Sequence, residues 1–157
     1  MVNKFGLIFF SFLLFTSINL RAQVSKGELE IIKSELKTEK KELVRRNMNL
    51  ISDEADIFWP IYNDYQQEKS AIMDERIKVL QHYADQYLVI SEEDAKKVAL
   101  DQFKFRKKSI MLRQKYFKIL SKKMSPVYGI RFIQIDRQID LLIEMKIFES
   151  MPLMQYR

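Results

Sequence analysis

Four stretches of the chain repeat apolar residues three and four positions apart, which is the spacing of one face of an α-helix. The first stretch covers about 25–47, and its apolar stripe consists of Leu29, Ile32, Leu36 and Leu43. Lys and Glu fill most of its other positions. Because so thin a stripe buries little apolar surface, we expect residues 23–50 to form a helix that packs loosely on the rest of the protein.

Pro60 divides the second stretch. Ser52 is a candidate N-cap, since its hydroxyl can accept from a free backbone N–H, and acidic residues follow it. Pro60 lacks a backbone donor and should break or kink the helix. We therefore expect a short helix at 53–59 and a long one at 60–87. The long helix would bury Ile61, Tyr65, Ile72, Val79, Leu80, Tyr83 and Tyr87. Glu68 and Arg76 lie near this stripe, either paired with neighbouring helices or exposed.

Ser91 and Ser125 mark the starts of the last two helices. Ser91 and the acidic residues after it come close to a capping box, which predicts a helix from 92 to about 123. Ser125 followed by Pro126 is an N-cap residue with proline at the first helical position, which predicts a helix ending near 149, before Pro152. The third helix carries a heptad-like seam: Ala95, Val98, Gln102, Phe105, Ser109, Leu112, Tyr116 and Ile119.

The last helix is apolar on nearly every side. Phe132, Ile135, Ile139 and Leu142 share one face, while Ile130, Ile133, Leu141, Ile143 and Ile147 spread over the others. A helix of this kind is usually buried on several sides. It would be either the central helix of a monomeric bundle or the interface of a homodimer, and the sequence leaves both open.

Glycine and proline are scarce, with three of each in 157 residues. Helices need neither residue in their interior, whereas β-sandwiches and barrels need many turn residues. No Gly/Ser-rich linker separates the helical stretches. We therefore predict an all-α fold: one domain at 23–157, built as a small bundle of about four helices with long central helices.

Residues 1–22 have the organisation of a secretory signal peptide. Lys4 precedes an apolar run of 11 residues at 5–15, and Ala22 provides a small residue for cleavage before Gln23. The run is shorter than the roughly 20 apolar residues of a membrane span, although an uncleaved anchor remains the alternative. Cleavage would leave 135 residues with 25 basic and 21 acidic side chains. We expect an exported, periplasmic protein.

Positive charge is concentrated in the third helix. Between Lys96 and Lys123 there are 11 Lys or Arg and one acid, whereas Glu28 to Glu68 contains 10 acids and six bases. Lys104, Lys108, Lys115, Lys118 and Lys122 share a face. This row either is a solvated face balanced by acidic neighbours or attracts an anionic partner. Export argues against nucleic acid, and a membrane surface is a less favoured alternative.

The chain lacks the residue combinations of common catalytic and metal sites. It has no cysteine and a single histidine, His82, which excludes a His-rich metal site and an ordinary Ser-His-Asp triad. His82 and Asp85 alone would make a weak metal site. The glycines are isolated, so no phosphate-binding loop is present. We therefore expect a protein that is not an enzyme, with no catalytic residue, metal or cofactor.

Three segments resemble the LTxxQ motif of the Spy/CpxP family of periplasmic proteins: Ile51-Ser-Asp-Glu-Ala55, Ile90-Ser-Glu-Glu-Asp94 and Met124-Ser-Pro-Val-Tyr128. Residues 118–126, followed by Phe132 and Gln134, are most similar to the second motif of the family. Serine replaces the motif threonine in each copy, and Ala55, Asp94 and Tyr128 stand where the motif has glutamine. The resemblance covers about 48–140.

The resemblance implies a small helical protein that forms an antiparallel, cradle-like homodimer and acts on unfolded clients without ATP or on envelope-stress sensors. We expect such a client to bind the cationic row together with nearby apolar side chains. The predicted site is Lys104, Lys108, Lys115, Lys118, Lys122, Phe103, Met111 and Phe117. The alternative is an adaptor that binds one folded envelope partner.

Overall fold

The computed structural model describes residues 39–86, 90–150 and 153. The described chain forms a helix at 39–48 and then α2 (Ser52–Gln86), α3 (Glu92–Lys123) and α4 (Pro126–Ser150). It contains no strand in these residues, so the predicted all-α fold with long central helices is confirmed. The predicted signal peptide, the first part of the N-terminal helix, Tyr87 and Pro152 lie outside the described residues.

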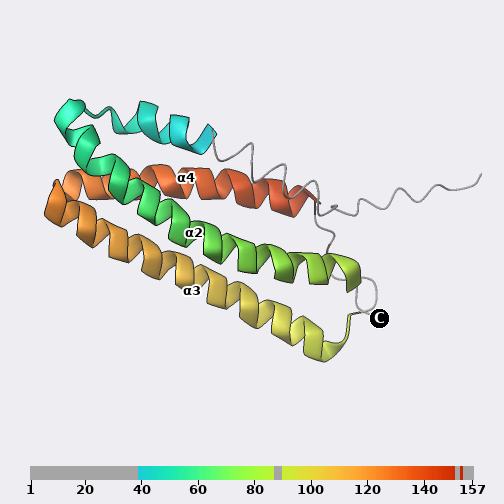
Figure 1. Ribbon diagram of the computed structural model, residues 1–157. Helices are drawn as coiled ribbons and strands as arrows, with labels where there is room; N and C mark the ends of the chain where they lie inside the picture. The colour runs from blue at the N-terminus through green and yellow to red at the C-terminus, as the bar shows by residue number, and fades with distance from the viewer. Residues whose placement is uncertain (1–38, 87–89, 151–152, 154–157) are drawn as a thin grey trace, which may run out of the picture.

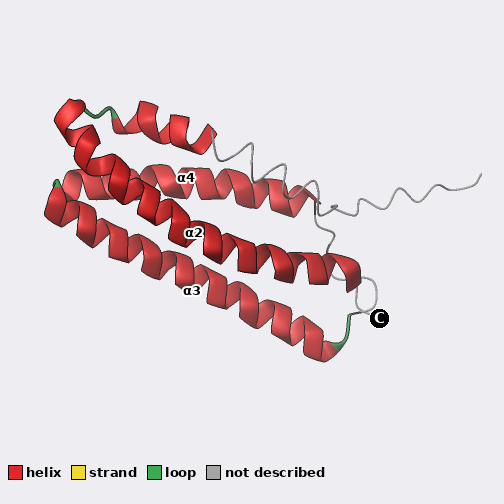
Figure 2. Ribbon diagram, viewed as in Figure 1, coloured by secondary structure: helices red, strands yellow, loops and turns green. Residues whose placement is uncertain are grey.

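The three long helices form an antiparallel bundle in which α3 packs along both α2 and α4 (Figure 1). The helix 39–48 lies beside α4 and turns into α2 through a short loop, and an equally short turn joins α3 to α4 (Figure 2). α3 and α4 meet at this turn and diverge away from it in Figure 1. The candidate site lies about half-way along α3 and α4, where residues 102–113 and 137–144 line a cavity.

Two of the predicted helix starts are confirmed. Ser91 has an extended backbone, and its hydroxyl oxygen accepts from the backbone N–H of Asp94 at 3.1 Å. Pro126 is the first residue of α4, and the Ser125 carbonyl accepts the N–H of Gly129 at 3.1 Å. α3 ends at Lys123, as predicted, with the Met124 N–H bonded to the Leu120 carbonyl.

The predicted cap at Ser52 is wrong by one residue. Ser52 is the first residue of α2, and Ile51 precedes the helix, with its carbonyl accepting the N–H of Ala55 at 2.9 Å. The Glu54 carboxylate accepts the Ile51 N–H at 3.1 Å. A glutamate at this position can satisfy the backbone in the absence of a capping hydroxyl, as the second half of a capping box does.

Pro60 does not divide α2, so the prediction of two separate helices is wrong. The helix is continuous through Pro60, although its first turns run at an angle to the rest in Figure 1. Proline leaves the carbonyl four residues earlier without its helical donor, here that of Asp56. Both Asp56 and Pro60 are exposed, so water can reach this carbonyl and the helix bends instead of ending.

The core joins all four helices at the end of the bundle where α3 meets α4. Phe58, Tyr62 and Tyr65 of α2 make edge and stacked ring contacts with each other or with Phe132 of α4. α3 buries Phe105, Leu112, Tyr116 and Leu120, so the predicted seam shifts at its end from Ile119 to Leu120. Aromatic packing of this kind contributes beyond the area it buries.

Of the predicted N-terminal stripe, only Leu43 lies within the described residues, and its predicted burial is wrong. Leu43 is exposed, whereas Val44 and Met48 are each 1% exposed and belong to the core. The described part of this helix is therefore firmly packed. α4 buries Phe132, Ile135, Ile139 and Ile143 but leaves Leu142 exposed.

Candidate functional site

A cluster of charged side chains lies inside the bundle. Asp136 of α4 is only 2% exposed, and its carboxylate accepts from the Tyr65 hydroxyl at 2.6 Å and from Lys69 Nζ at 2.5 Å. Arg113 Nε of α3 donates to the same carboxylate at 3.0 Å. Lys69 Nζ also lies 2.6 Å from Asp140 Oδ1, and Arg113 Nη2 donates to Asp140.

Helical spacing brings these groups together. Tyr65 and Lys69 are four residues apart on α2, and Asp136 and Asp140 are four residues apart on α4, so each pair shares one face of its helix. Arg113 projects from α3 between them and contacts both aspartates. The cluster therefore ties the three long helices to one another through hydrogen-bonded ion pairs.

Near neutral pH the Asp136 carboxylate is ionised and the Tyr65 hydroxyl to which it is hydrogen-bonded is protonated. Burial tends to raise the pKa of Asp136, but Lys69, Tyr65 and Arg113 outweigh burial and hold it below its usual range. Burial, together with Asp136, raises the pKa of the Tyr65 hydroxyl. An ionised aspartate and a protonated tyrosine orient neighbouring charges but do not exchange protons near pH 7.

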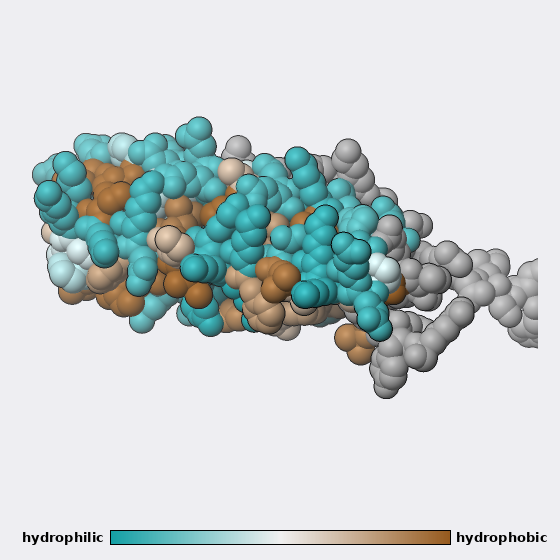
Figure 3. Space-filling model, turned by 90° about the horizontal axis from the view of Figure 1, so that it is seen from below, coloured by the Kyte–Doolittle hydropathy of each residue, from teal (hydrophilic) through white to brown (hydrophobic). Residues whose placement is uncertain are grey.

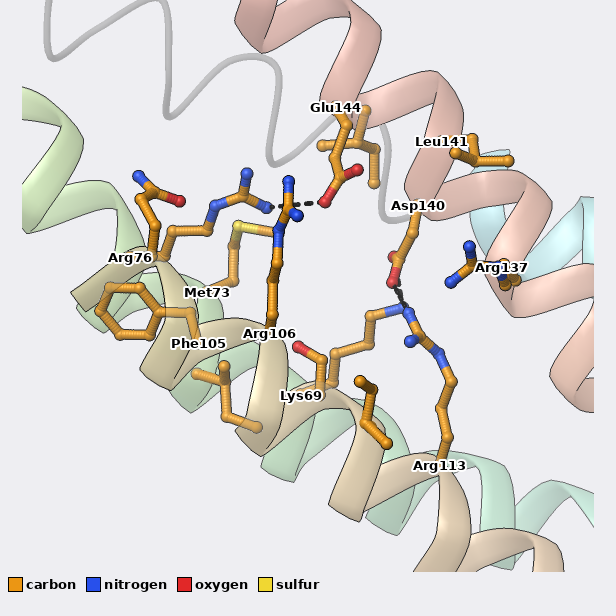
Figure 4. Close-up of a pocket in the computed structure, with 15 residues that line it drawn as sticks. Lys69, Met73, Arg76, Phe105, Arg106, Arg113, Arg137, Asp140, Leu141 and Glu144 are labelled. Carbon is orange, nitrogen blue, oxygen red and sulfur yellow. Dashed lines mark hydrogen bonds and ion pairs between the residues drawn. The ribbon is translucent and has the colours of Figure 1, made fainter. Parts of the chain in front are cut away.

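A cavity of about 420 Å³ adjoins this cluster between α3 and α4, with α2 as its floor. Lys69, Met73 and Arg76 come from α2 (Figure 4). Arg76 Nη1 lies 3.6 Å from the Glu144 carboxylate, while its Nε is buried without a hydrogen-bond partner. The other lining residues are Ile72, Gln102, Phe105, Arg106, Ser109, Ile110, Arg113, Arg137, Asp140, Leu141, Ile143 and Glu144.

Positive charge exceeds negative charge around the cavity. Lys69, Arg113 and Arg76 pair with Asp136, Asp140 and Glu144. In the part of the chain that the structure describes, Arg106 and Arg137 have no ion-pair partner, although both line the cavity. The two guanidinium groups come from opposite walls, one from α3 and one from α4.

The predicted cationic row is partly neutralised by α2. Lys108 Nζ lies 2.5 Å from Glu75, and Lys115 Nζ lies 2.6 Å from Glu68, whose carboxylate also accepts from the Tyr116 hydroxyl at 2.7 Å. These hydrogen bonds lower the pKa of Glu68 and of Glu75. The remaining members of the row, Lys104, Lys118 and Lys122, are exposed.

The structure does not gather the three predicted apolar contacts on one surface. Met111 is exposed between Lys108 and Lys115, on the side of α3 that meets α2. Phe117 is half-buried near Gly129 of α4, on the opposite side. Phe103 is 66% exposed and lies seven residues before Ile110, which lines the cavity.

Exposed apolar side chains that the sequence did not predict to form one surface flank the cavity. Ile110 of α3 and Leu141 of α4 line the cavity and are both exposed. Phe103 lies two turns before Ile110, and Phe148 lies two turns after Leu141, so both extend the surface toward the open end of the bundle. We call Phe103, Arg106, Ile110, Arg137, Leu141 and Phe148 the α3–α4 face.

The signal for this face was present in the apolar residues that surround the last helix, but periodicity alone could not separate an exposed face from a buried one. Seen from the side of α3, the surface is mostly hydrophilic, with apolar side chains between the charged ones (Figure 3). On the α3–α4 face, Phe103 and Phe148 are about two-thirds exposed. Large exposed apolar side chains beside a cavity are candidates for a binding surface.

The described residues contain no group of three or more His, Asp or Glu side chains placed to hold a metal ion. His82 Nε2 lies 3.8 Å from Asp94 across the α2–α3 interface. Among the helices that the structure describes, none has the length and apolar character needed to cross a membrane.

Comparison of the chain with protein-family models, with curated proteins and with solved structures finds no match. The resemblance to the Spy/CpxP family therefore stays a prediction from the sequence.

Proposed function

We propose that this protein acts in the bacterial periplasm as an ATP-independent, chaperone-like or stress-accessory protein that binds unfolded or partly folded polypeptides. The observation that carries this proposal is the α3–α4 face, where Phe103, Ile110, Leu141 and Phe148 are exposed and the cavity beside them is lined by Arg106 and Arg137. The resemblance of the three serine-led segments to the LTxxQ motif adds the periplasmic setting and a homodimeric arrangement.

The chemistry of the face suits unfolded chains. Apolar side chains that are two-thirds exposed can cover apolar segments of a client that folding has not yet buried. Arginine adds hydrogen bonds to backbone carbonyls and carboxylates and can stack on aromatic rings. Neither contact demands one particular sequence, so the face would accept many clients.

The exposed lysines of α3 would serve a different step. Lys104, Lys118 and Lys122 project into solvent, where their charge would attract acidic clients before contact. Attraction of this type raises association rates more than it strengthens the final complex, and it weakens as salt is added. We therefore assign the holding of clients to the α3–α4 face and the speed of capture to the lysine row.

The test is the aggregation of a reduced, unfolding client, followed by light scattering with and without stoichiometric protein. Replacement of Phe103 and Phe148 by serine should remove most of the protection. The matched control replaces Ile51 and Val127, which are equally exposed but belong to the starts of α2 and α4. Protection by the unaltered protein that both double variants retain would place client binding elsewhere on the chain. No protection by the unaltered protein at low salt, together with capture of one folded envelope protein, would identify the chain as an adaptor.

A further inference from the structure

The cavity between α3 and α4 presents hydrogen-bond donors that lack acceptors. Arg76 Nε is buried without a partner, and Arg106 and Arg137 have no ion pair among the described residues. In Figure 4 the side chains of Arg76 and Arg106 both extend toward α4. The buried Arg76 donor without an acceptor is unfavourable, whereas Arg106 and Arg137 are exposed and free to bind an anion.

Cationic side chains outnumber carboxylates around this cavity. Three carboxylates, those of Asp136, Asp140 and Glu144, serve five cationic side chains. Arg106 and Arg137 are exposed, so both guanidinium groups are open to a ligand that enters from solvent. An anion with two or three acceptor oxygens could bind both, since guanidinium groups match carboxylate and phosphate oxygens in geometry.

Six of the 15 residues that line the cavity are apolar. Met73 of α2, Phe105 and Ile110 of α3, and Leu141 and Ile143 of α4 contribute carbon surface beside the guanidinium groups. Ligand-binding cavities typically have volumes of about 300–1,000 Å³, with mostly apolar walls and a few polar groups that fix orientation. The cavity, at about 420 Å³, falls within this range.

We infer that this cavity binds a small amphipathic anion: a carboxylate or phosphate head held by Arg76, Arg106 and Arg137, with a short apolar body against Met73, Phe105 and Ile110. This is a site for a small molecule, and it shares Arg106, Ile110 and Arg137 with the α3–α4 face that we propose binds polypeptides. A lipid could supply the same head group, so the test includes both sources.

The first experiment compares octanoate, 1-octanol and octylammonium by isothermal titration calorimetry at low salt, with protein purified after expression of the 157-residue sequence. The three probes share one apolar body and differ in head charge. Octanoate should bind at least tenfold more tightly than octanol, and octylammonium should not bind measurably. Equal affinity for octanoate and octanol would overturn the inference, because it would show that the guanidinium groups do not contact the head.

The second experiment locates the site. The double variant Arg106→Gln/Arg137→Gln removes two positive charges without breaking any ion pair of the described residues, so the fold should persist. It should lose at least tenfold in octanoate affinity. Lys118→Gln/Lys122→Gln removes the same charge from the exposed row and should change the affinity less than twofold. Equal losses in the two variants would mean that octanoate responds to net charge and not to the cavity.

Octyl phosphate and vesicles containing phosphatidylglycerol distinguish the sources of the head group. If octyl phosphate displaces octanoate and the protein does not float with the vesicles, the ligand is a free amphiphile. Flotation that is lost in the Arg106/Arg137 variant but kept in the Lys118/Lys122 variant would support a lipid at the same site. Because these assays contain no unfolded client, their outcome is independent of the aggregation test.

Discussion

Asp136 makes more buried polar contacts than any other residue of the described chain: it binds Tyr65 and Lys69 of α2 and Arg113 of α3. Replacement by asparagine preserves the shape but removes the charge. Lys69 and Arg113 would then share only Asp140, and breaking a buried ion pair in this way costs about 3–5 kcal/mol. We predict a loss of that size in the free energy of unfolding, measured with urea at pH 7.

Asp64→Asn is the matched control for this variant. Asp64 is an exposed residue of α2, and loss of its charge should change the free energy of unfolding by less than about 0.5 kcal/mol. A similar small effect in both variants would contradict the structural role of the buried cluster.

Low pH should destabilise the folded protein through protonation of Asp136. The pKa of Asp136 is lowered in the folded protein, so its charge stabilises the fold at pH values above the unfolded-state pKa of about 4. This contribution is lost as the pH falls through the lower pKa of the folded state. The difference in unfolding free energy between the unaltered protein and Asp136→Asn should therefore narrow below about pH 4. A constant difference from pH 7 to pH 2 would contradict this assignment.

The burial of the charged residues in this cluster could not be predicted from the sequence. Lys69, Arg113, Asp136 and Asp140 are charged residues at ordinary helical spacing, which also describes any solvated helix surface. Only the packing of three helices shows that they face inward. Glu68 and Arg76 were predictable as candidates for pairing because they interrupt an apolar stripe, and both are paired in the structure.

At the scale of the helices, Gly129 sets how closely α3 and α4 approach at their turn. A Cβ atom at this position would lie 3.0 Å from both the Phe117 ring and the Ser121 hydroxyl. Gly129→Val adds three carbons there and should lower the free energy of unfolding by about 1–3 kcal/mol through overpacking. Chemical denaturation measures the effect. Val127→Ala, at an exposed position two residues earlier, should stay within about 0.5 kcal/mol, and an equal loss there would argue against close packing at Gly129.

Helix starts were predictable where one side chain carries the signal, as at Ser91 and Ser125. The sequence did not reveal that Glu54 would satisfy the Ile51 N–H, which moved the start of α2 by one residue. It also did not reveal that a solvent-exposed Pro60 would be accommodated by a bend. Both outcomes depend on solvent access and side-chain reach, which periodicity does not contain.

For the molecule as a whole, export is the first expectation to test. The charged start, apolar run and small residue at Ala22 predict cleavage before Gln23. Expression of residues 1–157 in a bacterium, followed by fractionation and intact mass measurement, should yield a periplasmic protein that begins at Gln23. A full-length protein in the membrane fraction would show that residues 1–22 act as an anchor.

The molecule is organised with different chemistry on its two sides. The lysine row lies where α3 meets α2, and two of its members are neutralised there by Glu68 and Glu75. The α3–α4 face lies on the other side, where exposed apolar side chains accompany Arg106 and Arg137 beside the cavity. The sequence predicted a cationic and aromatic binding surface on α3, but α4 contributes half of the face that we propose binds clients.

The most direct test of polypeptide binding is the solution mass of the purified protein by size-exclusion chromatography with light scattering, alone and with a reduced, unfolding client. We predict a soluble complex whose mass equals that of the protein plus the client, formed at low salt and lost in the Phe103→Ser/Phe148→Ser variant. A mass that does not change with the client, while the client aggregates at its normal rate, would contradict the proposal.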